Sequence, residues 1–303
     1  MALYVNTNVS SINGRRNLTN ATNNLNTTYQ RLSSGLRINS AKDDAAGLQI
    51  SDRLSSQING LNQGNRNSND GIALAQTIEG SMDEMTTMLQ RMRTLAVQAS
   101  NGTNSQADRD AIQQEVTQLS AEITRIASQT KFGGQQVLAG AANGVINDEG
   151  TVQLQVGAYA GDTLTLTGFS VAFSVSGIAS QLGKGQNDLK DLGLQADATL
   201  NHVRFTVSNQ TAASTAITGI DSFIAQIDKQ RAHLGAMQNR MESTIRNQSN
   251  ISMNVSDARS RIRDTDFAEE SAKLSQQSII QQAASSMLTQ ANSRPQIALS
   301  LLG

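Results

Sequence analysis

Few side chains in this sequence are of the kinds that perform catalysis or bind metal ions. The chain has no cysteine and only two histidines, His202 and His233, and neither belongs to a cluster with metal-ligand spacing. It contains no metalloprotease, nucleophile-elbow or phosphate-loop motif. We therefore interpret both histidines as ordinary surface or packing residues.

Two pairs of acidic residues are the remaining candidates for acid–base chemistry. Asp43 and Asp44 stand immediately before a helical pattern that begins near Ala45, and Asp264 and Asp266 stand before another. Aspartate is a favoured residue just before a helix, where its carboxylate accepts hydrogen bonds from free backbone N–H groups. Helix capping therefore explains these aspartate pairs better than catalysis does. The sequence as a whole predicts a protein that is not an enzyme, with no catalytic residues, no metal site and no cofactor.

The composition also narrows the range of partners. A net charge of -1 provides no field for nucleic acid or anionic lipid, so we expect no nucleic acid partner. No apolar run approaches the roughly 20 residues that span a bilayer, which argues against membrane insertion. Residues 1–5 are too short, and lack the basic flank, for a classical secretion signal, so export would need another route.

Aromatic residues are 3% of the chain and there is one proline, which favours long helices over a compact core.

Apolar residues at helical spacing predict long amphipathic helices at both ends and in the middle of the chain. Residues 2–36 are expected to form one helix, and a last helix should follow residue 267. Between them, helices from about residues 45, 105 and 213 carry heptad-like patterns, and the short turn at 101–105 makes the first two antiparallel. Methionines at this spacing, such as Met85 and Met92, are interpreted as core residues.

The period changes to two in the middle of the chain, which predicts short strands. These are expected at 152–156, 164–166, 171–175 and 203–207. The fold class is therefore mainly α: a long antiparallel coiled-coil-like bundle with a small β-rich module. We expect three parts: residues 1–44 with 268–303 as terminal helices, 45–140 with 208–267 as a helical rod, and 141–207 as the β-rich region.

Three segments carry a family resemblance. Residues 32–51, LSSGLRINSAKDDAAGLQIS, resemble the N-terminal hallmark of bacterial flagellins, and residues 231–240 and 260–269 are similar to flagellin signatures near the C-terminus. The resemblance covers about two thirds of the chain and leaves out residues 140–210. It implies a self-polymerising subunit of the extracellular bacterial flagellar filament, exported by the flagellar type III route. It also implies a flagellar export chaperone, a filament cap and junction proteins as partners.

The resemblance implies that the terminal helices form an inner layer of the filament. Helix physics agrees, since isolated amphipathic helices must bury an apolar stripe to be stable. We predict the packing residues of this layer from the apolar stripes at the two ends. They are Val5, Val9, Ile12, Leu25, Tyr29, Leu32, Leu36, Leu274, Ile280, Met287, Leu288 and Leu301.

Residues 89–97 resemble the segment through which a vertebrate Toll-like receptor recognises many flagellins. Carried over by position, the contact residues would be Gln90, Arg91, Leu95 and, on the neighbouring helix, Glu115. Thr94 stands where recognised members commonly have an acidic residue. The same segment could instead serve lateral packing between subunits.

Two other functions remain open at this stage. A hook-filament junction protein would share the terminal helices without polymerising indefinitely. A secreted adhesion or binding module would use the helices only to display the β-rich region.

Overall fold

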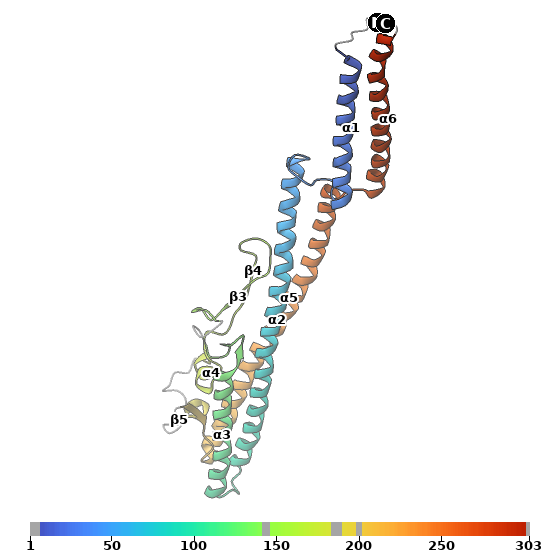
Figure 1. The fold of residues 1–303 in the computed structure, drawn as a ribbon. Coiled ribbons are helices and arrows are strands. Elements are labelled where there is room, and N and C mark those ends of the chain that lie inside the picture. Colours follow the sequence, from blue (N-terminus) through green and yellow to red (C-terminus); the bar gives the residue numbers. More distant parts are fainter. Residues whose placement is uncertain (1–6, 141–145, 183–189, 198–201, 301–303) are drawn as a thin grey trace. The chain divides into compact units, whose positions relative to one another are not determined.

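The computed structural model describes residues 7–140, 146–182, 190–197 and 202–300 and is mainly α-helical, as predicted (Figure 1). Contacts divide the chain into two compact units, which we call the terminal unit, residues 1–58 with 251–303, and the central unit, residues 59–250. The helices are α1 (Val9–Ser34), α2 (Ala45–Ser100), α3 (Gln106–Gln129), α4 (Val175–Gln181), α5 (Gln210–Arg263) and α6 (Phe267–Ser300). The strands are β1 (Lys131–Phe132), β2 (Gln135–Gln136), β3 (Val152–Gln155), β4 (Thr163–Leu166), β5 (Leu194–Asp197) and β6 (His202–Phe205).

Long helices form the frame of the central unit. The turn after α2 ends at Ser105, whose hydroxyl accepts a hydrogen bond from the Asp108 backbone N–H while the Asp108 carboxylate accepts from the Ser105 N–H. This capping box starts α3, which returns antiparallel along α2. Ion pairs then connect α2 to its neighbours, with 2.8 Å from Arg91 Nε to Glu115 Oε1 on α3 and 2.6 Å from Arg93 Nε to Asp221 Oδ1 on α5.

The predicted heptad positions face the core of this unit. Met82, Met85 and Met92 have no exposed surface, which confirms their interpretation as core residues. Val116 and Ile123 of α3 and Ile220 and Ile227 of α5 close the same core.

In the described part of the chain the strands pair as three antiparallel two-stranded hairpins: β1–β2, which precedes the predicted β-rich region, and β3–β4 and β5–β6 within it. In the second, Val152 pairs with Leu166 and Leu154 with Leu164. The apolar side of the region joins the helical core, where the Phe205 ring packs edge-on against Phe223 of α5 with centroids 5.1 Å apart.

The predicted strand at 171–175 is wrong. Helix α4 begins at Val175, because the Ser174 hydroxyl caps it by accepting a hydrogen bond from the Gly177 N–H at 3.2 Å. Val175, Ile178 and Ala179 are buried at helical spacing. The alternation that resembled a strand is a turn with Phe173 buried, followed by a short helix.

In the terminal unit, helices α1 and α6 run side by side and antiparallel (Figure 1). Asn8 Nδ2 donates to the Ala291 carbonyl at 2.7 Å near one end, and Arg31 lies 3.9 Å from Glu270 near the other. Among the described residues no helix is long and apolar enough to cross a membrane.

A candidate self-assembly surface on the terminal helices

Helices α1 and α6 meet along a narrow line of small and apolar side chains. Ala21 is 3% exposed and Leu25 is 9% exposed at this contact. At Gly14, an added Cβ would lie 3.2 Å from Leu288 Cδ1, so the glycine lets α6 approach α1 closely. The pair therefore buries part of each apolar stripe without any other element.

Most large apolar side chains of this pair nevertheless remain in contact with solvent. Val9 is 58% exposed, Ile12 56%, Tyr29 54%, Ile280 42% and Met287 68%. The large buried side chains of the central unit, by contrast, have essentially no accessible surface. The terminal pair thus has an incomplete core, since a helix normally hides such a stripe against a partner.

A groove of about 970 Å³ follows the contact between the two helices. Its floor is made of small residues such as Gly14, Ala21 and Ala284, and Ile280 and Met287 stand at its edges. Asparagine and glutamine side chains supply the polar part of its lining, and Arg294 is its one charged residue. Such a mixture of apolar and amide groups suits contact with another protein surface better than binding of an ion.

Two segments, residues 35–44 after α1 and 264–266 before α6, connect the terminal pair to α2 and α5. We call them the joint, and backbone hydrogen bonds hold it together. Gly35 ends α1 in the left-handed conformation with φ 72°, and its carbonyl accepts a hydrogen bond from Thr265 N–H at 3.0 Å. Arg37 N–H donates to the Arg263 carbonyl at 2.7 Å, and Leu36 forms an isolated antiparallel bridge with Asp264. The two connecting segments are therefore fastened to each other rather than left as separate loops.

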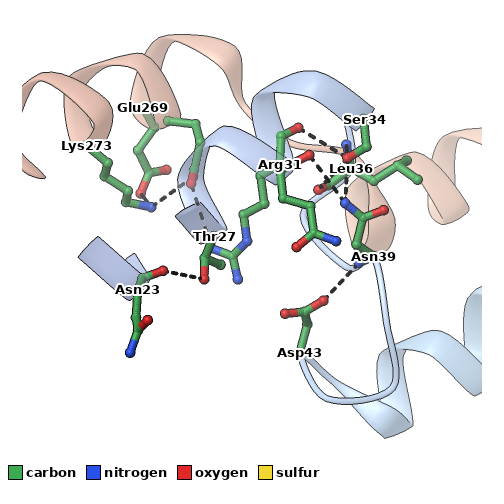
Figure 2. A network of polar contacts seen from close by, with 11 residues as sticks. Asn23, Thr27, Arg31, Ser34, Leu36, Asn39, Asp43, Glu269 and Lys273 are labelled. Atoms are coloured by element: carbon green, nitrogen blue, oxygen red, sulfur yellow. Dashed lines mark hydrogen bonds and ion pairs between the residues drawn. The ribbon is translucent and has the colours of Figure 1, made fainter. Parts of the chain in front are cut away.

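Of the four aspartates predicted to cap helices, Asp44 and Asp266 do so, whereas Asp264 forms the backbone bridge to Leu36. Asp44 Oδ1 accepts from Gly47 N–H at 2.9 Å at the start of α2, and Asp266 Oδ1 accepts from Ala268 N–H at 2.8 Å at the start of α6. Asp43 instead holds the loop, because its carboxylate accepts hydrogen bonds from the N–H and hydroxyl of Ser40 and from the Asn39 N–H. Figure 2 shows the contact with Asn39. Those hydrogen bonds, from the Ser40 backbone first, lower the pKa of Asp43 below its ordinary value.

One polar cluster of the joint could not be read from the sequence. The Glu270 side chain is 4% exposed and lies 3.9 Å from Arg31 and 3.6 Å from Lys273. Lys273 also contacts Glu269 at 2.7 Å, and this hydrogen bond raises the pKa of Lys273 (Figure 2). The two contacts of Lys273 are i,i+4 and i,i+3 pairs within one helix, whereas the contact of Glu270 with Arg31 requires the antiparallel pairing of α1 and α6.

The predicted packing residues are buried, half-buried or exposed, and two of them lie outside the described residues. Leu25 is buried within the terminal pair, and five others are exposed on it as given above. Val5 and Leu301 lie outside the described residues. The half-buried members are Leu32, Leu36, Leu274 and Leu288.

The receptor-like segment lies on α2 and α3 of the central unit. Gln90 is exposed, and Arg91 and Glu115 form an exposed ion pair. Leu95, in contrast, is only 3% exposed and belongs to the core. The four residues therefore do not form one exposed surface, because the core packing of α2 turns Leu95 inward.

Other chemistry has little geometric support in the described part of the chain. No group of three or more histidine, cysteine, aspartate or glutamate side chains there could hold a metal ion. His233 is half-buried on α5, and nothing is described of the His202 side chain.

Comparison with known proteins decides the family. Residues 5–143 match the model of the bacterial flagellin N-terminal helical region, and residues 217–302 match that of the bacterial flagellin C-terminal helical region. The chain belongs to the bacterial flagellin family. It is 38% identical over 377 aligned positions to flagellin D of Vibrio anguillarum and 39% identical over 379 to polar flagellin B/D of Vibrio parahaemolyticus, with all of each chain covered.

A solved structure of a flagellar hook-associated protein from Vibrio parahaemolyticus is also similar, with a TM-score of 0.56 at 16% identity over 73% of this chain and all of that one. This likeness concerns the fold alone. Flagellins are structural proteins, not enzymes, and this one is a subunit of the extracellular flagellar filament that polymerises with its own copies.

Proposed function

We propose that α1 and α6 form the inner layer of the flagellin filament, and that the exposed apolar side chains of this pair become buried against copies of the same chain. The observation that carries the proposal is the incomplete core of the terminal pair. Val9, Ile12, Tyr29, Ile280 and Met287 are exposed there. The groove between the two helices, which Ile280 and Met287 help to line, adds a concave surface. Contacts between unlike surfaces of identical subunits do not close, so they extend into a helical polymer.

In this proposal the three predicted parts have separate tasks. Residues 1–44 with 268–303 form the inner layer, residues 45–140 with 208–267 form a stiff rod, and residues 141–207 lie outside. The well-packed core of the central unit supports the rod's task, since side chains without exposed surface make it rigid. The filament then converts rotation of the flagellar motor into thrust.

Electron microscopy of the purified chain tests the inner-layer assignment. Full-length protein should form long tubes, whereas a variant lacking residues 268–303 should stay unpolymerised with the thermal transition of its central unit unchanged. Tubes formed by the shortened chain would overturn the assignment. Short closed assemblies of the full chain would favour a hook-filament junction protein instead.

An adhesion or binding module makes a different prediction. Tyr159 is 61% exposed at the tip of the β3–β4 hairpin, within the region such a module would display. In the filament proposal, replacing Tyr159 by alanine leaves tube formation intact. Loss of tubes in this variant would place the hairpin in the assembly contacts and contradict its outer position.

Export and assembly partners follow from the same proposal. As a member of the flagellin family, the chain is expected to leave the cell through the flagellar type III route with an export chaperone. It is then incorporated under the filament cap and onto junction proteins. Deleting the genes for that export route should retain the chain inside the cell. Its appearance in the medium of such a strain would contradict the route.

We further propose recognition by the vertebrate flagellin-sensing Toll-like receptor through Gln90, Arg91 and Glu115. The exposed Arg91–Glu115 pair supports this, because both charges are accessible on adjacent helices. Leu95 is buried in the core, so it would hold α2 in place through its packing rather than contact a receptor directly.

A reporter-cell assay tests this recognition with a matched pair of variants. Arg91→Ala should reduce signalling, while Arg93→Ala should leave it intact, since Arg93 pairs with Asp221 on α5 instead. Equal signalling from wild type and Arg91→Ala would overturn the assignment.

A further inference from the structure

The sulfur-containing side chains of this chain differ sharply in accessibility. The sequence has nine methionines, no cysteine and no tryptophan, so methionine is its most readily oxidised residue. In the described chain, the methionines at 82, 85, 92, 237 and 241 are buried and Met88 is half-buried. Only Met253, at 64%, and Met287, at 68%, are exposed among the described methionines.

These two exposed methionines occupy different surroundings. Met287 lies on α6 at the edge of the groove between the terminal helices, in the same lining as Ile280 and Ala284. Its neighbour Leu288 packs on Gly14 of α1. Met253 lies on α5 and does not line this groove. Oxidants in solution therefore reach both thioethers, but only one of them belongs to the candidate assembly surface.

We propose that Met287 is an oxidation site whose state sets how readily the subunit assembles. The inference rests on the proposed function, because it requires the groove to be buried against another copy. The oxidant is a peroxide: the Met287 sulfur attacks one peroxide oxygen, an S–O bond forms and the O–O bond breaks. With hydrogen peroxide, the thioether loses two electrons and becomes a sulfoxide, and the other oxygen leaves as water after proton transfer.

The sulfoxide changes the surface that a second copy must cover. A flexible apolar side chain becomes a polar one, and burying its oxygen in a largely apolar contact without a hydrogen-bond donor is unfavourable. Assembly of oxidised subunits is therefore weakened. In the polymer the same sulfur is covered, so oxidation acts on free subunits and spares those already incorporated.

Pelleting assays on hydrogen peroxide-treated monomer test the proposal, with mass spectrometry reporting sulfoxide at each methionine. Oxidised wild type should show a critical concentration raised by about tenfold, equivalent to about 1.4 kcal/mol. Oxidised Met253→Leu should show the same rise in critical concentration as oxidised wild type. Met287→Leu, a swap of similar volume, should instead have the same critical concentration before and after the treatment. Assembly of treated Met287→Leu as poor as that of treated wild type would overturn the inference.

Two further measurements distinguish failure of this inference from failure of the proposed inner-layer function on which it rests. Untreated Met287→Gln, polar and similar in length, should reproduce the loss of assembly with unchanged monomer helicity, and normal assembly of this variant would also overturn the inference. Peroxide treatment of finished polymer should leave Met287 unoxidised and Met253 oxidised. If Met287 is instead oxidised equally fast in monomer and polymer, the groove is not covered and the inner-layer proposal itself fails.

Discussion

Replacing Ile12 by alanine should weaken polymerisation without weakening the monomer. Ile12 is 56% exposed on α1, so the monomer gains little from its outer methyl groups. Full burial of an isoleucine side chain contributes about 1.5–3 kcal/mol, and just over half of that surface remains to be covered on assembly. Alanine keeps part of the side chain and favours helix, so the expected loss on assembly is about 1 kcal/mol per subunit.

A loss of that size raises the critical concentration about fivefold, which pelleting across a concentration series can measure. Circular dichroism should show unchanged helicity and melting of the monomer. Tyr159→Ala is the matched control, since Tyr159 is similarly exposed, at 61%, but lies on the β3–β4 hairpin. The reasoning fails if Ile12→Ala polymerises like wild type, or if both variants lose assembly to the same extent.

Three further perturbations test the fold that supports this surface. Leu25→Ala should lower the stability of the α1–α6 pair by about 2–5 kcal/mol. Hydrogen exchange should then be faster in these two helices and unchanged in the central unit. An unchanged exchange rate in the two helices would contradict the packing of Leu25. Met92→Ala should lower the stability of the central unit by about 2–5 kcal/mol. Arg93→Ala, which breaks an exposed ion pair, should change thermal unfolding far less. Equal effects of the two substitutions would refute the assignment of Met92 to the core. Because hydrogen bonds lower the folded-state pKa of Asp43, its contribution to the joint is present above the ordinary aspartate pKa of about 3.9 and is lost as pH falls through the lower folded value. The protection factor of the Ser40 amide, in which the intrinsic pH dependence of exchange is divided out, should therefore fall in acid in wild type, and Asp43→Asn should remove this fall.

The long helices could be predicted from the sequence because their evidence is local. Met82, Met85 and Met92 recur at heptad spacing over a long segment, and all three are in the core. The residue type of Asp44 and Asp266 likewise predicts a helix start at each position, and each aspartate accepts the expected backbone hydrogen bond. Such signals depend on a few neighbouring positions and not on the rest of the fold.

The contacts between distant segments could not be predicted in the same way. The bridge between Leu36 and Asp264 joins residues far apart in the chain, and the Arg31–Glu270 pair needs α1 and α6 to be antiparallel. Leu95 shows the related difficulty that a position carried over by resemblance does not specify which way the side chain faces. Val175 shows that a short alternating pattern does not distinguish a strand from a turn followed by a helix.

Hydrogen exchange measured on monomer and on polymer tests the central claim most directly. Peptides from Val9–Ser34 and Phe267–Ser300 should become strongly protected in the polymer, while peptides from the buried part of α2, around Met85 and Met92, should be equally protected in both states. Equal protection of α1 and α6 before and after assembly would show that the terminal pair gains no partner, and would contradict the account.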